Sequence, residues 1–316
     1  MGLFSRQKKK SGWMAISFQT DGIYAAYAQS AIGSRPTIEW LSFYPSAGYT
    51  LAASLDKLEK EHKTAGYQCA NLLGTGDYQM LSVDAPPVPA NELKSAVRWR
   101  LKDMLDYPVD DATIDVLSVP ADKGLAARNS TLFAIAARNQ LIQKRQAQFD
   151  EAKLALQVID VPDMAQRNIS ALLEPEGRAI ALLSVNDDGT LITVTCGGEL
   201  YFSRHIDIAA GQLRDADQDA ISAFHERITL ELQRSMDYFD RQYHSTPLAK
   251  LVLAPMEGLD EPLRDYLSAN LYVPVETLDL ASVLNLSGTP ELKSKDLQQR
   301  YFLVIGAALR QEVEAP

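Results

Sequence analysis

The side chains that could perform catalysis or bind a metal are scattered along this sequence. Cys69 and Cys196 lie far apart and belong to no CxxC pair, so no structural zinc site is expected. No GxSxG motif places a serine on a nucleophile elbow, so hydrolase chemistry has no support. The histidines show no metal-ligand spacing and are expected at the surface or hydrogen-bonded within the fold: His62, His205, His225 and His244.

Two Asp-Gly turns are the remaining candidates for chemistry. Asp21–Gly22 and Asp187–Asp188–Gly189 each lie between two apolar runs. An aspartate can serve a metal ion, and a nearby glycine lets backbone N–H groups approach a phosphate. The same dipeptide is also a common turn of a β-hairpin. We predict that both are plain hairpin turns.

The elements around these turns divide the chain into two similar halves. Each half opens with a strand, an Asp-Gly turn and a second strand, followed by helices and further strands. This mixture predicts layered α/β domains. Residues 175–178 are the expected boundary between a first domain (12–175) and a second domain (176–316). A smaller subdomain is expected in the second domain at about 210–250.

A Pro-rich link at 85–89 marks the entry into a small inserted subdomain, expected at about 84–138. A helix over 92–106 follows, with Asn91 as its cap and Pro108 as its end. Two strands are expected to complete the insert, at 113–119 and 131–137.

The helix of the insert has two unlike faces. At 3.6 residues per turn, Trp99 projects almost opposite to the apolar stripe that is formed by Leu93, Val97, Leu101 and Met104. A large aromatic side chain on a polar face usually has something to cover it. We therefore expect Trp99 at or beside a contact with a partner. The alternative is that Trp99 packs against a strand or loop of its own subdomain.

Composition and charge exclude several classes of function. With 316 residues, 46% of them hydrophobic, the chain can build two compact domains. Its net charge of −10 disfavours nucleic acid as a partner, because binding needs a basic surface that displaces counterions. No apolar run approaches the roughly 20 residues that cross a bilayer, and no secretory signal peptide is expected. The cysteine usage fits a reducing cytoplasm.

The first eleven residues form a basic tail that we expect to be disordered. Its lysines would add weak affinity for anionic lipid, and two apolar residues would insert shallowly beside them. The membrane contacts expected are Leu3, Phe4, Lys8, Lys9 and Lys10. The alternative is a solvated tail with no role.

Four stretches carry a resemblance to known proteins: ELKSAVRWRLKDMLDYPVDD (92–111), GGELYFSRHIDI (197–208), ITLELQRSMDYFDRQY (228–243) and YFLVIGAALR (301–310). In this order and spacing they resemble the PilM family of type IV pilus assembly proteins and its MshI relatives of the mannose-sensitive haemagglutinin (MSHA) pilus. The resemblance covers nearly the whole chain. It implies an α/β, two-domain actin-like (ASKHA) ATPase fold with a small subdomain inserted in the first domain.

The resemblance also implies a role at the platform that builds a type IV pilus. Family members are cytoplasmic, lie peripheral to the inner membrane, and bind the cytoplasmic tail of a bitopic membrane protein of the PilN or MshJ type. The resemblance places this contact in the first domain, and we expect it at Trp99, Arg98 and Asp103. A homo-oligomer and a peripheral membrane contact are also compatible with the sequence.

The nucleotide loops that the resemblance implies have lost their characteristic residues. In the family, the first phosphate loop has Asp, Gly and Lys, and the second has Asp and Gly. This chain has other side chains at those positions. It also lacks the family's Gly-rich adenosine loop. Without them the loops neither orient Mg²⁺ nor close on phosphate, so we expect no bound cofactor. The departing positions are Ser17, Gln19, Tyr24, Ser184, Asn186, Pro255, Met256 and Glu257.

Three functions remain open from the sequence. The leading expectation is a scaffold without enzymatic activity that docks components of the pilus platform. The alternative is an enzyme of the same fold that binds or hydrolyses ATP-Mg with altered loops. A third is a relative that acts on a type II secretion platform. The missing Asp and Gly residues of the loops favour the first.

Overall fold

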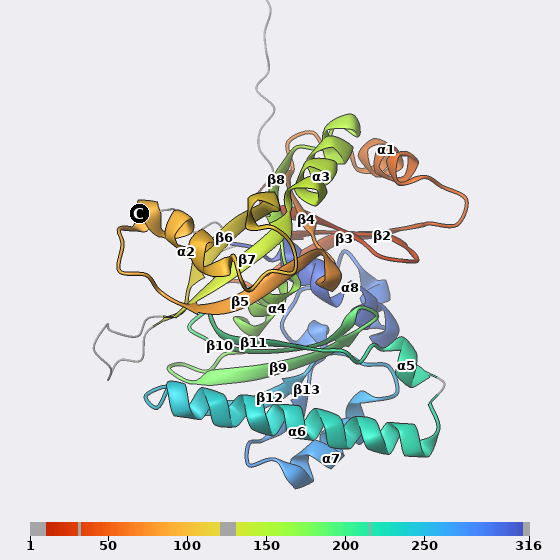
Figure 1. The fold of residues 1–316 in the computed structure, drawn as a ribbon. Coiled ribbons are helices and arrows are strands. Elements are labelled where there is room, and N and C mark those ends of the chain that lie inside the picture. Colours follow the sequence, from red (N-terminus) through yellow and green to blue (C-terminus); the bar gives the residue numbers. More distant parts are fainter. Residues whose placement is uncertain (1–10, 31–32, 121–130, 215, 312–316) are drawn as a thin grey trace, which may run out of the picture.

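The computed structural model describes residues 11–30, 33–120, 131–214 and 216–311 (Figure 1). All but the last residue of the predicted basic tail lie outside the described residues. The same holds for the predicted membrane contacts Leu3, Phe4, Lys8, Lys9 and Lys10.

The first sheet has the strand order β3-β2-β1-β4-β8. The first three pair antiparallel, and β4 and β8 add in parallel. Its strands are β1 (Trp13–Phe18), β2 (Gly22–Gln29), β3 (Thr37–Pro45), β4 (Gln68–Leu72) and β8 (Leu156–Asp160). Strands β1 and β2 are buried over nearly their whole length because helices cover both faces of the sheet. These helices are α1 (Leu51–His62) and α3 (Asn139–Glu151) on one face and α8 (Lys295–Ala308) on the other.

The second sheet repeats this order as β11-β10-β9-β12-β13. Again the first three strands pair antiparallel and the last two add in parallel. Its strands are β9 (Ala179–Asn186), β10 (Gly189–Cys196), β11 (Glu199–Ile206), β12 (Leu248–Leu253) and β13 (Val275–Thr277). In both sheets the Asp-Gly pair forms the turn of the opening hairpin, as the sequence predicted. Gly189 has a φ of 129°, which favours glycine.

Two helices lie between the sheets. α4 (Pro162–Ser170) contacts the second sheet, and α8 contacts the first. They cross so closely that a Cβ atom on Gly306 would lie 2.2 Å from the carbonyl oxygen of Ala165. Asn168 Nδ2 donates to the carbonyl of Gly306 at 2.9 Å. Side chains of both sheets join α4 and α8 in one core cluster, so the two halves are packed together.

The outer face of the second sheet is covered by α6 (Gln218–Gln242) and α7 (Asp260–Asn270). Asp217 caps α6 by accepting a hydrogen bond from the N–H of Ala220. The residues predicted as a smaller subdomain, 210–250, contain α6. Its buried side chains belong to the same core cluster as β9 and β10. A short helix, α5 (Gly211–Arg214), precedes it.

The inserted subdomain is a three-stranded antiparallel sheet with the order β5-β7-β6. Its elements are β5 (Tyr78–Asp84), α2 (Leu93–Leu101), β6 (Ala112–Ser118) and β7 (Thr131–Arg138). Val97 and Leu101 of α2 are buried against it. In Figure 1 this unit lies beside the first sheet, with α2 on its outer side.

Three details of the predicted insert helix are wrong. The helix ends at Leu101, well before Pro108, because the chain turns there: the N–H groups of Met104 and Leu105 both donate to the carbonyl of Leu101. Asn91 lies in a 3₁₀ turn and does not cap α2. Met104 therefore leaves the apolar stripe and is 46% exposed. Within the described ranges, no helix is both long enough and apolar enough to cross a membrane.

Candidate functional site

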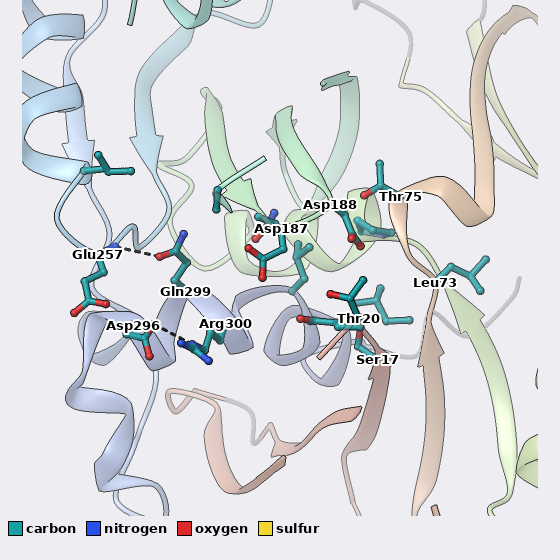
Figure 2. A pocket seen from close by; sticks show the side chains of 17 residues that line it. Ser17, Thr20, Leu73, Thr75, Asp187, Asp188, Glu257, Asp296, Gln299 and Arg300 are labelled. Atoms are coloured by element: carbon teal, nitrogen blue, oxygen red, sulfur yellow. Dashed lines mark hydrogen bonds and ion pairs between the residues drawn. The ribbon is translucent and has the colours of Figure 1, made fainter. Parts of the chain in front are cut away.

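A cavity of about 240 Å³ lies where the opening hairpins of the two sheets meet the start of α8 (Figure 2). We call it the interdomain cleft. The structure brings the three predicted nucleotide loops together around it. Ser17, Gln19, Asn186 and Glu257 line the cleft. The other four positions, Tyr24, Ser184, Pro255 and Met256, are buried and do not line it.

Tyr24 stands where the resemblance expects a phosphate-binding lysine. Its hydroxyl donates to Asp21 Oδ2 at 2.7 Å, and its ring meets that of Tyr301 edge-on at 5.1 Å. Burial, followed by the hydrogen bond to Asp21, raises the pKa of Tyr24 well above its ordinary value. The position therefore holds a neutral hydroxyl that is already bonded, and it supplies no positive charge for a phosphate.

Ser184 stands where the second loop would have its aspartate. Its hydroxyl donates to Gln166 Oε1 at 2.6 Å and accepts from Asn186 Nδ2 at 3.0 Å. Gln166 Nε2 in turn donates to the carbonyl of Leu182 at 2.9 Å and to Thr193 Oγ1 at 3.0 Å. These residues satisfy one another in the interior, so this position directs no carboxylate into the cleft.

The charged side chains of the cleft are mainly acidic. Four carboxylates line it, from Asp187, Asp188, Glu257 and Asp296. Arg300 is the one cation among the described lining residues, and its Nε already donates to Asp296 Oδ1 at 2.9 Å. A triphosphate entering this space would meet like charge at short range. The described lining therefore offers a triphosphate no unpaired cation.

The cleft is also bridged by the protein itself. The backbone of Thr75, in the 3₁₀ turn η1 (Thr75–Asp77), hydrogen-bonds to the Asp188 carboxylate from the opposite half. Burial and the neighbouring Asp187 nevertheless raise the pKa of Asp188. Gln299 accepts from the N–H of Glu257 at 3.1 Å and donates to the carbonyl of Val185 at 3.2 Å. The Thr75–Asp188 hydrogen bond therefore connects the two halves across the cleft, whereas Gln299 joins α8 to two other segments of the second domain.

Sequence reasoning missed part of this lining. Asp187 and Asp188 were predicted only as turn residues, and they do form the turn, but their side chains also reach the cleft. Asp296, Gln299 and Arg300 of α8 were not singled out. Their spacing places them on one polar face of a helix whose opposite face is apolar, which is the signal that could have found them.

A second cavity, of about 220 Å³, lies between the inserted subdomain and the first domain. We call it the insert groove, and its lining includes Gln79, Asp106, Tyr107, Arg138 and Leu141. Tyr107 is only 9% exposed, yet its hydroxyl has no hydrogen-bond partner, and the buried Gln79 Oε1 has none either. The guanidinium of Arg138 lies 4.1 Å above the ring of Tyr107. The groove thus contains two polar atoms that make no hydrogen bond.

The predicted partner-binding residues lie on α2 and just after it. Trp99 is 76% exposed, so the alternative that it packs within its own subdomain is wrong. Arg98 donates to the carbonyl of Ala112 at 3.3 Å and to Asp110 Oδ1 at 3.2 Å, which holds α2 to the rest of the insert. Asp103 is exposed. Trp99 and Met104 are therefore two exposed apolar side chains on one small subdomain.

A buried carboxylate connects the insert to the second domain. Asp163, at the start of α4, is fully buried and accepts hydrogen bonds from Tyr78 of β5 and Ser203 of β11. His205 Nε2 lies 3.2 Å from Asp163 Oδ1. Burial alone would raise the pKa of Asp163, but His205, Ser203 and Tyr78 together hold it below its ordinary value. We call these four residues the Asp163 cluster.

Comparison with known proteins matches residues 50–216 to the family model described as Type IV pilus assembly protein PilM. A solved structure described as the PilM-PilN type IV pilus biogenesis complex is similar, with 18% identity over 94% of this chain and 98% of that chain and a TM-score of 0.72. Comparison with curated proteins gives no match.

Two further solved structures share the architecture. One is a Bacteroides thetaiotaomicron protein of actin-like ATPase fold and unknown function, with 11% identity over 93% and 100% of the two chains and a TM-score of 0.52. The other is the cytoplasmic domain of EpsL, an inner-membrane component of the Vibrio cholerae type II secretion system, with 15% identity over 94% and 100% and a TM-score of 0.50. The predicted two-domain actin-like α/β fold is confirmed.

Proposed function

The chain belongs to the PilM family of type IV pilus assembly proteins, and on this premise we propose that it is a scaffold of a pilus assembly platform rather than an ATPase. The observation that supports this best is the chemistry of the interdomain cleft. Four carboxylates face one arginine there, and that arginine is already paired. A nucleotide site needs backbone N–H groups and an available cation for the phosphates, besides the carboxylates that orient a metal ion.

The absence of nucleotide binding is tested by titration calorimetry with Mg-ATP. We expect no binding at micromolar nucleotide, because entry would place phosphate against Asp187, Asp188 and Asp296. A family member with an intact Asp, Gly and Lys loop serves as the positive control. Micromolar binding by this chain would support the alternative, an actin-like protein that binds ATP, and would overturn the proposal.

We propose that the scaffold docks the cytoplasmic tail of a bitopic membrane protein of the PilN or MshJ type on its inserted subdomain. The similar structure is described as a PilM-PilN complex. In this chain the insert groove offers an unpartnered hydroxyl on Tyr107 and an unpartnered amide oxygen on Gln79. Both atoms are buried in the free chain, so a peptide backbone would pair with them by opening the groove locally. Trp99 and Met104 add exposed apolar area on the same subdomain.

Docking is tested by binding of a synthetic tail peptide to Trp99→Ala. We expect the variant to stay folded, because Trp99 is 76% exposed, and to bind the peptide about tenfold more weakly or worse, as hot-spot aromatics do. Tyr272→Ala is the matched control, since Tyr272 is also a largely exposed aromatic, at 62%, but lies in the second domain. Normal binding by Trp99→Ala would contradict the assignment of this residue.

We further propose that the platform is that of an MSHA-type pilus and that the chain is held at the cytoplasmic face of the inner membrane by this tail. The support is the resemblance of the four sequence stretches to MshI proteins. Affinity purification from the native host is the test. Recovery of an MshJ-like protein is expected, whereas recovery of a type II secretion component in its place would reassign the platform.

A further inference from the structure

The outward face of α6 has an ordered pattern of charge. This 25-residue helix buries one side against the second sheet and lies along the outer surface of that domain (Figure 1). On the opposite side, every third or fourth residue is exposed. The stripe is formed by Asp219, Ala223, Glu226, Leu230, Arg234, Asp237 and Arg241. Its mean spacing is about 3.67 residues, so it runs nearly straight along the helix axis.

The charges of the stripe are arranged around Leu230, which is 46% exposed. Four residues to either side of it stand Glu226 and Arg234, and eleven residues to either side stand Asp219 and Arg241. In each of these two pairs, one side chain is acidic and the other is basic. Rotating the stripe by 180° about Leu230 therefore places each of these charges on an opposite charge.

We propose that α6 is a two-fold symmetric contact with a second copy of this chain, in which the two helices run antiparallel and cross at Leu230. In this arrangement Glu226 faces Arg234 of the second copy, and Asp219 faces its Arg241. Symmetry makes each pair occur twice. Parallel helices would instead place like charges opposite one another, which is unfavourable. The order of charges along α6 therefore favours a second copy of this chain as the partner and an antiparallel direction for its α6.

The charges of the stripe are available for such pairing. Within the described part of the chain, the side chains of Asp219, Glu226 and Arg241 take part in no hydrogen bond or ion pair. Arg234 pairs with Glu231 of the same helix at 3.0 Å, but its side chain remains 60% exposed. An exposed pair of this kind contributes little to stability, so Arg234 can also reach across a contact.

The size of the contact predicts a weak dimer. The stripe spans about 33 Å along the helix, and a contact about 10 Å wide would bury about 330 Å² on each copy. This is less than half of the roughly 800 Å² per partner that is usual for a stable complex. The dimer is therefore expected to be transient in dilute solution and is best detected by covalent trapping.

Disulfide trapping tests the geometry, in a Cys196→Ser background that retains the buried Cys69. Leu230→Cys should cross-link to itself, since helices packed 8–10 Å apart bring facing Cα atoms to about 4–6 Å, within disulfide range. Ala223→Cys alone should not cross-link, because antiparallel helices hold its two copies about 21 Å apart. Ala223→Cys combined with Asp237→Cys should. Equal trapping of the Leu230→Cys and Ala223→Cys variants, or of neither, would overturn the proposal.

Charge reversal tests the pairing independently. Glu226→Arg places two arginines opposite each other on both sides of the crossing and should reduce trapping of the Leu230→Cys variant about tenfold or more. Adding Arg234→Glu reverses both members of the pair and should restore trapping. Circular dichroism checks that each variant remains helical. If the single reversal has no effect, or the double reversal fails to restore trapping in a folded protein, the two helices do not pair in this way.

Discussion

The interdomain cleft and the insert groove are cavities of similar size with opposite polar chemistry. In the cleft the chain bonds to itself: Gln299 with the backbone of two segments, and Asp188 with the backbone of Thr75. Behind it, the buried Ser184 is bonded to Gln166. Among the described residues that line it, none carries a buried side-chain nitrogen or oxygen without a partner. The groove has two such atoms, on Tyr107 and Gln79.

The difference in unsatisfied polar atoms indicates in which of the two cavities a ligand would bind at the lower free-energy cost. A ligand in the cleft would displace hydrogen bonds that already exist and would meet four carboxylates. A ligand that opens the groove would pair with atoms that are buried and unsatisfied in the free protein, and it would relieve the cost of leaving them unpaired. Under the proposed function, the actin-like fold serves as a support for the insert.

The largest expected effect concerns Asp163, which connects the groove to the second domain through Tyr78. Asp163→Asn places an amide NH₂ where a carboxylate oxygen accepts from Tyr78 or Ser203. We expect a loss of about 2–3 kcal/mol in the free energy of unfolding, measured by urea denaturation at neutral pH. An unchanged midpoint of the urea transition would mean that the insert groove and the second domain are not coupled through Asp163.

The same substitution should change the response to acid. The pKa of Asp163 is lowered in the folded chain, so its stabilising contribution is present above the ordinary carboxyl pKa of about 3.9. That contribution is lost as the pH falls through the lower folded value. The Asn variant should therefore lose less stability than the parent between about pH 4 and pH 2. Parallel acid curves for the two proteins would contradict this.

An intermediate effect is expected from Ser184→Ala in the hydrogen-bonded network beside the cleft. The substitution leaves Gln166 Oε1 without its donor and Asn186 Nδ2 without its acceptor. Because Gln166 is buried, we expect a loss of about 1–2 kcal/mol in the free energy of unfolding. Thermal and urea unfolding check the value, and Ser203→Ala in the Asp163 cluster is a second hydroxyl deletion for comparison.

The smallest effect, with the opposite sign, is expected from Tyr107→Phe in the insert groove. Removing a buried hydroxyl that has no partner should leave the free energy of unfolding unchanged or raise it by up to about 1 kcal/mol. Binding of the tail peptide should weaken if that hydroxyl pairs with it. A loss of stability as large as that of Ser184→Ala would remove the distinction between groove and cleft.

The fold could be predicted from the sequence to a large extent because its two hairpins have strong local signals. Asp21–Gly22 and Asp187–Asp188–Gly189 lie between apolar runs, and the strands and helices after them follow clear periodicity. The end of α2 could not be predicted, since the turn that packs the partly buried Leu105 against the insert depends on tertiary contacts. Periodicity extended the helix to Met104, which is exposed.

Part of the candidate site could also be predicted, because the sequence resembles a known family. Ser17, Gln19, Asn186 and Glu257 were placed at the cleft by resemblance, and they line it. The groove was not predicted, because Gln79, Tyr107 and Arg138 come from three separate segments that meet only in the folded chain. No local pattern records that a buried hydroxyl will lack a partner, since that depends on every neighbour at once.

The close crossing at Gly306 fixes the position of α8 along α4. Sliding α8 by one residue would bring Ile305 or Ala307 to the place where even a Cβ atom would lie 2.2 Å from the carbonyl oxygen of Ala165. The hydrogen bond from Asn168 to Gly306 opposes the same movement. A force along the helix axis that acts on one half of the molecule is therefore transmitted to the other half, because α4 and α8 cannot slide past each other.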